Sequence, residues 1–231
     1  TLANLQKANF LAEPKDVVDL SPMAGLTKLK ELTFSQANIA DISPLAGMAD
    51  LEKLALNSSS IADLTPLANM KKLKTLELAY LKTPNGFDPI GELSELTFLN
   101  ISSSTFSNYE ALAKCQKLES LQAQGTSNFA DLSVLSGLPN FKRLGVGGNK
   151  SIQDWSALPS LTQLESFQAA STSFSDLALL AKMDKLREFG VQECALVNFE
   201  AIAALPSLTN INVTDATGIA DISALKTLPL L

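Results

Sequence analysis

Seven aspartates recur at one position of a repeated pattern, and regularly spaced carboxylates could bind metal ions. They are Asp19, Asp41, Asp63, Asp131, Asp154, Asp176 and Asp221, with Asn108 and Asn198 at two further equivalent positions. A carboxylate before a helical turn can instead cap it, by accepting a hydrogen bond from an amide two or three residues on. Asparagine replaces aspartate well as a cap but poorly as a cation ligand. We therefore expect caps and no metal site.

A glycine-rich run, Gly145-Val-Gly-Gly-Asn-Lys-Ser151, is similar to a phosphate-binding loop. In a true loop of that kind, glycine directly precedes lysine and the loop opens a helix. Here Asn149 separates glycine from Lys150, and the run lies within the repeat described below. We expect no nucleotide site there, and the glycines should leave a shallow floor in a sheet.

Composition excludes several other kinds of site. The chain has no histidine, so it can form neither a Ser-His-Asp nor a Cys-His catalytic group. Its 18 basic and 24 acidic residues give a net charge of −6, whereas nucleic-acid binding needs a concentrated cationic surface. No apolar run approaches the roughly 18 residues of a membrane-spanning helix. We expect a binding protein with no catalytic residue and no cofactor, rather than an enzyme.

A repeat of 22 or 23 residues organises the whole chain. Leu29-Lys-Glu-Leu-Thr-Phe34 aligns with Leu51-Glu-Lys-Leu-Ala-Leu56 and with Leu73-Lys-Thr-Leu-Glu-Leu78. The second half of each copy is equally regular, as Ile39-Ala-Asp-Ile-Ser-Pro-Leu45 and Ile61-Ala-Asp-Leu-Thr-Pro-Leu67 show. Nine copies fill residues 29–230, and a partial copy or cap precedes them at residues 1–28.

Residue spacing predicts the structure of each half copy. Leu54 and Leu56 are two apart and share one face of a short strand, whereas Leu64, Leu67 and Met70 are three apart and suit a 3₁₀ turn. Ordering the roughly 22 residues of one copy costs about 1.5 kcal/mol per residue. Its seven or so apolar side chains return only about 1.5–3 kcal/mol each, which is too little to fold a lone copy. The copies must therefore stack, which pairs their strands into one parallel sheet.

The pattern resembles the leucine-rich repeat family, LxxLxLxxNxL, and its second half is most similar to the 22-residue class of bacterial internalins and SDS22-type proteins. This resemblance implies an α/β fold in one domain, residues 1–231. That fold is a right-handed solenoid, a horseshoe or arc with a parallel concave sheet and 3₁₀ or short helical turns on the convex side. In this family an asparagine after each strand, the ladder asparagine, hydrogen-bonds the turn of the next coil. In this chain it is present only at Asn149, and the equivalent positions hold Ala37, Ser59, Leu81, Ser104, Thr126, Thr172, Cys194 and Ala216. At the alanines and the leucine we expect a bridging water or a local change of shape.

Two further features stand out against the repeat. Extra residues at Lys82-Thr-Pro-Asn-Gly86 follow a strand, and their turn-forming types predict a protruding loop. Cys115 and Cys194 fall at core and ladder positions four copies apart, or about 19 Å along a stack of strands. A disulfide needs Cα atoms within about 7 Å, so we expect two buried, unpaired thiols.

Side chains between and beside the strand leucines should line the concave face, and most are amides, hydroxyls or glycines. Tyr80 and Phe98 are exceptions of the aromatic type that anchors tight interfaces, and Arg143 lies among glutamines. The predicted partner-binding residues are Tyr80, Phe98, Asn100, Gln122, Gln124, Arg143 and Gln168. The alternative is that this face is merely solvated, and that binding uses a rim or another part of the protein.

Three functions fit these observations. The resemblance implies a non-enzymatic protein–protein interaction module of a bacterial surface-exposed or secreted internalin-like protein, with a host or cell-surface protein as partner. The alternatives are a cytoplasmic SDS22-like regulatory or scaffold subunit and, because the columns are neutral amides and hydroxyls, a carbohydrate-binding module. We expect no nucleic-acid partner and a monomer. The last copy is uncapped, because Leu225-Lys-Thr-Leu-Pro-Leu-Leu231 begins a new coil. The alternatives there are that more protein follows or that this edge self-associates.

Overall fold

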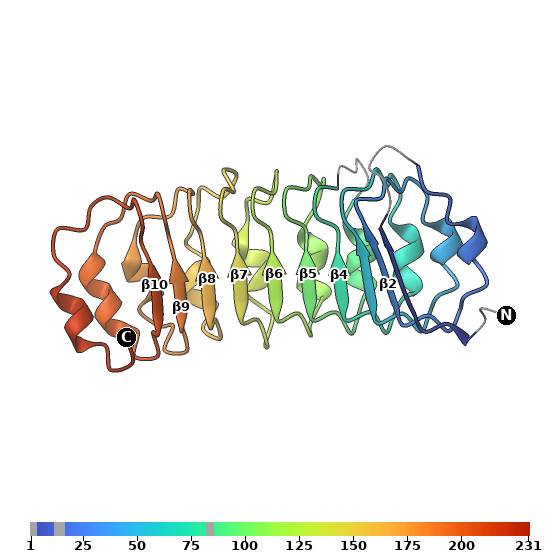
Figure 1. Cartoon of the computed structure of the whole chain (residues 1–231). Helices are drawn as coiled ribbons and strands as arrows, with labels where there is room; N and C mark the ends of the chain where they lie inside the picture. Colours follow the sequence, from blue (N-terminus) through green and yellow to red (C-terminus); the bar gives the residue numbers. More distant parts are fainter. Residues whose placement is uncertain (1–3, 12–16, 82–85) are drawn as a thin grey trace. The chain divides into compact units, whose positions relative to one another are not determined.

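The computed structural model describes residues 4–11, 17–81 and 86–231. The chain forms two compact units, Thr1–Leu118 and Glu119–Leu231, called here the first and the second unit. Each unit is built from short strands that alternate with 3₁₀ turns (Figure 1).

The strands of each unit are parallel and follow the order of the chain. The described part of the first unit holds β1 (Lys7–Leu11), β2 (Glu31–Ser35), β3 (Lys53–Leu56), β4 (Thr75–Glu77) and β5 (Phe98–Asn100). The second unit holds, over its described residues, β6 (Ser120–Gln122), β7 (Arg143–Gly145), β8 (Ser166–Gln168), β9 (Glu188–Gly190) and β10 (Asn210–Asn212). Equivalent residues of neighbouring copies are register partners, as Leu32 is of Leu54 and Leu144 is of Phe167.

One 3₁₀ turn follows each strand from β2 onward, and a first turn precedes β2. In the first unit the turns are η2 (Ser21–Met23), η3 (Ser43–Leu45), η4 (Thr65–Asn69), η5 (Asp88–Glu92) and η6 (Glu110–Lys114). In the second unit they are η7 (Leu132–Leu135), η8 (Leu158–Ser160), η9 (Leu177–Leu180), η10 (Phe199–Ala204) and η11 (Ser223–Thr227). Proline opens η2, η3, η4 and η5, where its fixed φ suits a helical turn and its missing N–H is not needed.

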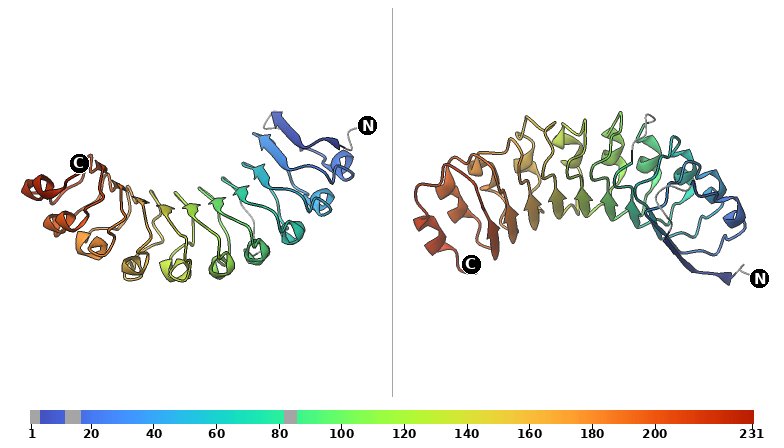
Figure 2. Two further views of the ribbon diagram at one scale, coloured as in Figure 1. Left: turned by 90° about the horizontal axis from the view of Figure 1, so that it is seen from below. Right: turned by 45° about the horizontal axis from the view of Figure 1, so that its top comes forward.

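The core of each unit lies between its strands and its turns, which occupy opposite sides (Figure 2). Leu54, Leu56 and Leu67 are fully buried, as the spacing predicts. Each such side chain contributes about 1.5–3 kcal/mol by leaving water. In the last copy, by contrast, Ile222 is 62% exposed although the equivalent Ile42 is 1% exposed.

A left-handed residue follows each strand from β2 onward, one to three residues beyond the strand's end. These residues are Gln36, Ser58, Tyr80, Ser103, Gly125, Gly148, Ser171, Glu193 and Asp215, with φ between 55° and 69°. The N–H of Tyr80 donates to the carbonyl of Ser102 in the next copy at 2.8 Å, and Glu193 donates to Thr214 in the same way. A left-handed residue cannot continue an extended chain, so the strands stay short and the backbone turns away from the sheet.

Short parallel strands alternating with 3₁₀ turns are thus confirmed in both units. Residues 7–11, which match the repeat poorly, form β1 and pair in parallel with β2. The single domain over residues 1–231 and the self-association of the last copy remain predictions. No helix in the described part of the chain is long and apolar enough to cross a membrane.

Candidate functional site

The strand residues that point away from the core form rows across each sheet. We call the row between the two strand leucines the central row. In the first unit it consists of Asn9, Thr33, Ala55, Glu77 and Asn100. In the second unit it consists of Gln122, Gly145, Gln168, Gly190 and Asn212. The predicted site residues fall into one group in each unit.

The first-unit group contains Tyr80, Phe98 and Asn100. Tyr80 is 63% exposed and is held in the left-handed region with φ 62°. Phe98 is half-buried and lies two residues before Asn100 on the same face of β5. The Asn100 Oδ1 accepts a hydrogen bond from the N–H of Ser102 at 3.0 Å, which fixes the amide group on the sheet.

Charged groups in and beside the first unit's central row are paired with one another. Lys53 lies 3.2 Å from Glu77, and Lys7 lies 2.7 Å from Glu31. The Asn57 amide donates to Glu77 at 3.3 Å, and its oxygen accepts from the N–H of Ala79 at 2.8 Å. These contacts use up much of the hydrogen-bonding capacity of the surface.

The second-unit group contains Gln122, Gln124, Arg143 and Gln168, gathered around Gly145. Gln122 and Gln168 are on the strands on either side of Gly145, and Arg143 is two residues before it. The Gln124 amide donates to the Gln122 Oε1. Arg143 is exposed, and its guanidinium lies 4.0 Å from Glu165.

The shallow floor expected at the glycines of residues 145–148 is wrong at Gly145, because glutamine side chains cover it, and they also cover Gly190 on β9. A Cβ on Gly145 would lie only 2.8 Å from the Gln122 Oε1, and one on Gly190 would overlap the Gln168 Oε1. Glycine at these two positions lets the neighbouring amide groups lie flat on the sheet. The rest of the phosphate-loop-like run is structural: Asn149 is fully buried, and the Lys150 ammonium donates to the Ser171 carbonyl.

The aspartate column caps the turns, as expected. Eight of its nine described members accept a hydrogen bond from the N–H two residues on, at 2.7–2.9 Å. The hydroxyl of Ser21, and then its N–H, lowers the pKa of Asp19, and Thr65 acts likewise on Asp63. The N–H of the serine two residues on, and then its hydroxyl, lowers the pKa of Asp154 and Asp221.

Asn198 is the exception to the caps. It has a φ of 55° and makes no cap; its amide donates instead to the Asp176 Oδ1 of the preceding copy at 2.8 Å. Among the described residues, no group of three or more Cys, Asp or Glu side chains is placed to hold a metal ion.

Hydroxyl groups replace the missing ladder asparagines. The Ser59 hydroxyl donates to the Ala37 carbonyl at 3.3 Å. The Ser104 hydroxyl accepts from the N–H of Leu81 at 2.9 Å and donates to the Leu78 carbonyl at 2.7 Å. At Ala37 and Leu81 the serine of the next copy therefore bonds the backbone directly, where we expected a water or a change of shape.

The thiols are buried, as predicted. Cys115 and Cys194 are both free in the structure. Burial raises the pKa of the Cys115 thiol to about 11, so it is protonated and unreactive near neutral pH. In the predicted protruding loop, residues 82–85 lie outside the described part of the chain.

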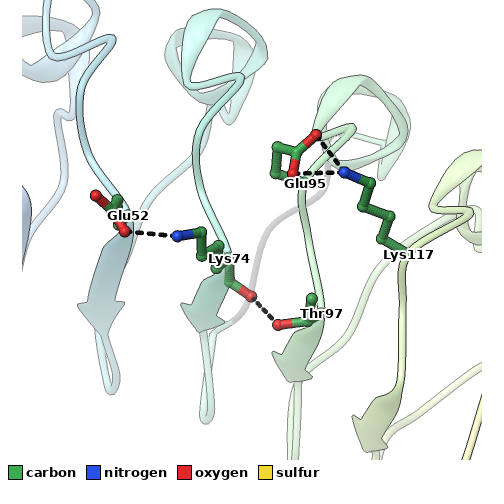
Figure 3. A network of polar contacts seen from close by, with 5 residues as sticks. All are labelled: Glu52, Lys74, Glu95, Thr97 and Lys117. Carbon is green, nitrogen blue, oxygen red and sulfur yellow. Dashed lines mark hydrogen bonds and ion pairs between the residues drawn. The ribbon is translucent and has the colours of Figure 1, made fainter.

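Alternating charges line one edge of the first unit's strands, a feature that sequence reasoning missed. Lys74 bonds Glu52 at 2.7 Å, Lys117 bonds Glu95 at 2.7 Å, and the Thr97 hydroxyl donates to the Lys74 carbonyl at 3.1 Å (Figure 3). Ion pairs at this level of exposure contribute little stability. Their sign alternation was readable from the sequence, because the partners are 22 residues apart.

Known proteins of similar structure share the repeat. The chain matches an internalin (inlF) from Listeria monocytogenes with a TM-score of 0.85 and 28% identity, over 100% of this chain and 67% of that one. The internalin C2 of the same species matches with a TM-score of 0.73 and 26% identity, over 83% of each chain. The sequence matches no protein-family profile and no curated protein.

A third match shows the fold alone. It is the ectodomain of the receptor kinase GASSHO1/SCHENGEN3 from Arabidopsis thaliana, in complex with Casparian strip integrity factor 2. The TM-score is 0.64 at 17% identity, over 84% of this chain and 25% of the receptor. The resemblance to leucine-rich-repeat proteins, internalins among them, is confirmed, and the chain has the leucine-rich-repeat fold.

Proposed function

We propose that this chain is a non-enzymatic protein–protein interaction module that binds a partner with the exposed faces of its strands. The observation that carries the proposal is the central row of each unit, in which most of the outward residues have polar side chains held on paired strands. Neighbouring backbones fix these side chains at regular spacing, which favours recognition of another surface. The receptor ectodomain that shares the fold is itself in complex with a named protein factor.

We further propose a bacterial surface-exposed or secreted setting, with a host or cell-surface protein as partner. This finer assignment is supported by the two Listeria internalins, which are 28% and 26% identical to the chain.

Two groups of residues supply the proposed contacts. Tyr80 and Phe98 are the apolar anchors of the first unit, since Tyr80 is largely exposed and Phe98 is partly exposed. Arg143 and the glutamines around it supply hydrogen-bond donors in the second unit. Aromatic residues and arginine are the types that most often dominate binding energy at protein interfaces.

Site-specific photo-crosslinking tests the proposal. A crosslinking amino acid replaces Tyr80 in the turn after β4, or Gln168 on β8, or Asp41 before a 3₁₀ turn as the control. The variants are exposed to cell-surface proteins of a host. We expect a crosslinked protein from Tyr80 and from Gln168 and none from the control. Crosslinking only from Asp41 would place binding elsewhere.

Alanine substitution then measures each group against the captured partner. We expect Tyr80→Ala and Phe98→Ala each to weaken affinity at least tenfold, which is about 1.4 kcal/mol. Gln153→Ala, in a residue outside the strands, should leave affinity unchanged. Unchanged affinity in both aromatic variants would remove the first-unit group from the site.

Carbohydrate binding is the second candidate, favoured by the uncharged amides of the second unit's central row. Binding to an array of purified glycans, without any protein partner, would favour it over the protein-binding proposal.

A further inference from the structure

The central row of the second unit alternates strictly between carboxamides and glycines. Strand register pairs Gln122 with Gly145, Gly145 with Gln168, Gln168 with Gly190, and Gly190 with Asn212. The first unit has no such alternation in its described central row, where Thr33, Ala55, Glu77 and Asn100 follow one another.

Gly190 is the point of the row where amide groups lack partners. The Gln168 carboxamide lies against Gly190, and its side chain makes no hydrogen bond within the described part of the chain. The Gln192 Oε1 faces the same glycine; it is buried and has no hydrogen-bond partner among the described residues. Buried polar atoms are nearly always hydrogen-bonded in proteins, and of these two carboxamides it is the Gln192 Oε1 that is buried. This unbonded oxygen beside the half-buried Gln168 carboxamide indicates a place for a ligand's polar groups.

The spacing of the row suits a polypeptide backbone. The amides of Gln122, Gln168 and Asn212 occur on every second strand, which sets them about 9.6 Å apart. Three residues of a polyproline II segment advance about 9.3 Å, and three of a β-strand about 10 Å. A carboxamide has one acceptor and two donors, so it can pair with the C=O and N–H of a peptide group.

We propose that the second unit binds an uncharged, extended peptide segment of its partner along the central row. Gln122, Gln168 and Asn212 then bond peptide groups three residues apart, and a seven-residue segment spans the row. An uncharged segment fits because this row carries no charged side chain over the described strands. The inference rests on the proposed function and names the form in which a protein partner is recognised.

Gly190→Ala offers a sharp test, because alanine there displaces only the end of a flexible side chain. The added Cβ would overlap the Gln168 Oε1, whereas the backbone φ at Gly190 is not positive and tolerates alanine. Gly147→Ala is the matched control, since its Cβ would make only ordinary contacts of 3.4 Å or more with Ala170. Gln168→Ala removes the amide itself, and Gln153→Ala controls for loss of a glutamine outside the strands.

The probe is a phage-displayed library of random twelve-residue peptides. The selected sequence is then made as a labelled peptide, and affinity is measured by fluorescence anisotropy. We expect Gln168→Ala to weaken binding at least tenfold and Gly190→Ala about fivefold, with both controls within twofold of the parent chain. Urea unfolding of each variant shows that it is folded.

Backbone N-methylation tests the register, because each methyl group removes one N–H donor from the peptide. We expect affinity to fall at positions three residues apart and to hold at those between. The inference would be overturned if no peptide were selected, if the N-methylation scan showed no three-residue period, or if Gln168→Ala bound the peptide as tightly as the parent chain. Binding to glycans alone would also overturn it.

Failure of the inference is distinguishable from failure of the proposed function. If no peptide binds but a folded protein partner does, and Arg143→Ala weakens that complex, only the extended-peptide inference fails. If a folded partner binds every strand-face variant equally, both fail.

Discussion

The central row of the first unit contains an ion-paired glutamate, whereas that of the second unit places glutamines over glycines. Lys53 and Glu77 neutralise each other at 3.2 Å in the first unit. In the second unit, Gln168 makes no side-chain hydrogen bond within the described residues. The strands and turns of the two units are built in the same way, so this difference lies in the outward side chains. It shows that one repeat backbone can carry a surface whose polar groups bond to one another and a surface that still has hydrogen-bonding groups available.

The largest expected difference between the units is at the ladder position. Asn149→Ala removes a buried amide that donates to the Phe129 carbonyl at 3.1 Å and accepts from the N–H of Ser151 at 2.9 Å. Because the buried Phe129 carbonyl and the part-buried Ser151 N–H both lose the amide, we expect a loss of about 2–3 kcal/mol in the free energy of unfolding. Ser59→Ala in the first unit removes one long bond of 3.3 Å and should cost about 1 kcal/mol or less. Urea unfolding measures both; equal losses would show that the ladder does not distinguish the units.

The next effect concerns the left-handed residue after each strand. Gly148 has a φ of 69°, so Gly148→Ala should cost about 1 kcal/mol of stability. The equivalent Ser103 has a φ of 57°, and Ser103→Gly should change stability by less than about 0.5 kcal/mol. Ser103→Gly relieves the strain of the left-handed backbone, but glycine also raises the conformational entropy of the unfolded chain, so the two effects offset each other. Thermal unfolding of the two variants checks this, and a stable Gly148→Ala would contradict it.

A smaller effect tests the first unit's ion pairs. Lys53→Met removes the partner of Glu77, whose side chain is 25% exposed, and we expect a loss of about 0.5 kcal/mol or less. That loss should disappear in 1 M salt, because salt screens exposed charges. Arg143→Met in the second unit, where the pair is 4.0 Å apart, should show no salt-dependent change. A larger salt effect at Arg143 would reverse the comparison.

The smallest effect per residue is one that the units should share. The folded-state pKa values of Asp19, Asp63, Asp154 and Asp221 are lowered, so their caps stabilise the chain above the ordinary carboxyl range. This stability is lost as the pH falls through the folded pKa values, below about pH 4. Replacing all four by asparagine, which keeps the amide acceptor, should reduce the fall in melting temperature between pH 5 and pH 3. The two aspartates of the first unit and the two of the second should each account for about half of this reduction. An unchanged fall in melting temperature would contradict the stabilising role of the caps.

The sequence predicted the periodic parts of the structure well. Leu54, Leu56 and Leu67 are buried because their spacing repeats with the strand and the turn, and the aspartates cap because they precede each turn. The left-handed residues were not predicted, since Tyr80 and Glu193 carry no glycine signal and their φ follows from the path of the backbone. Asn198 was wrongly predicted to be a cap, because its bond to Asp176 runs between copies. The position of the glutamines over Gly145 and Gly190 could not be predicted without the register of the strands. The partner-binding role of Tyr80, Phe98, Asn100, Gln122, Gln124, Arg143 and Gln168 remains a prediction.

The alternating charges along the edge of the first unit make its copies differ by parity. At one repeat position the chain carries Lys28, Asp50, Lys72, Glu95 and Lys117, and the two lysines on either side of Asp50 lie 3.9 and 2.7 Å from it. Deleting the single copy at residues 51–72 would bring Asp50 beside Glu95, whereas deleting residues 51–95 would bring it beside Lys117. Shortening this edge by one copy would therefore set like charges side by side, whereas shortening it by two copies would keep the signs alternating.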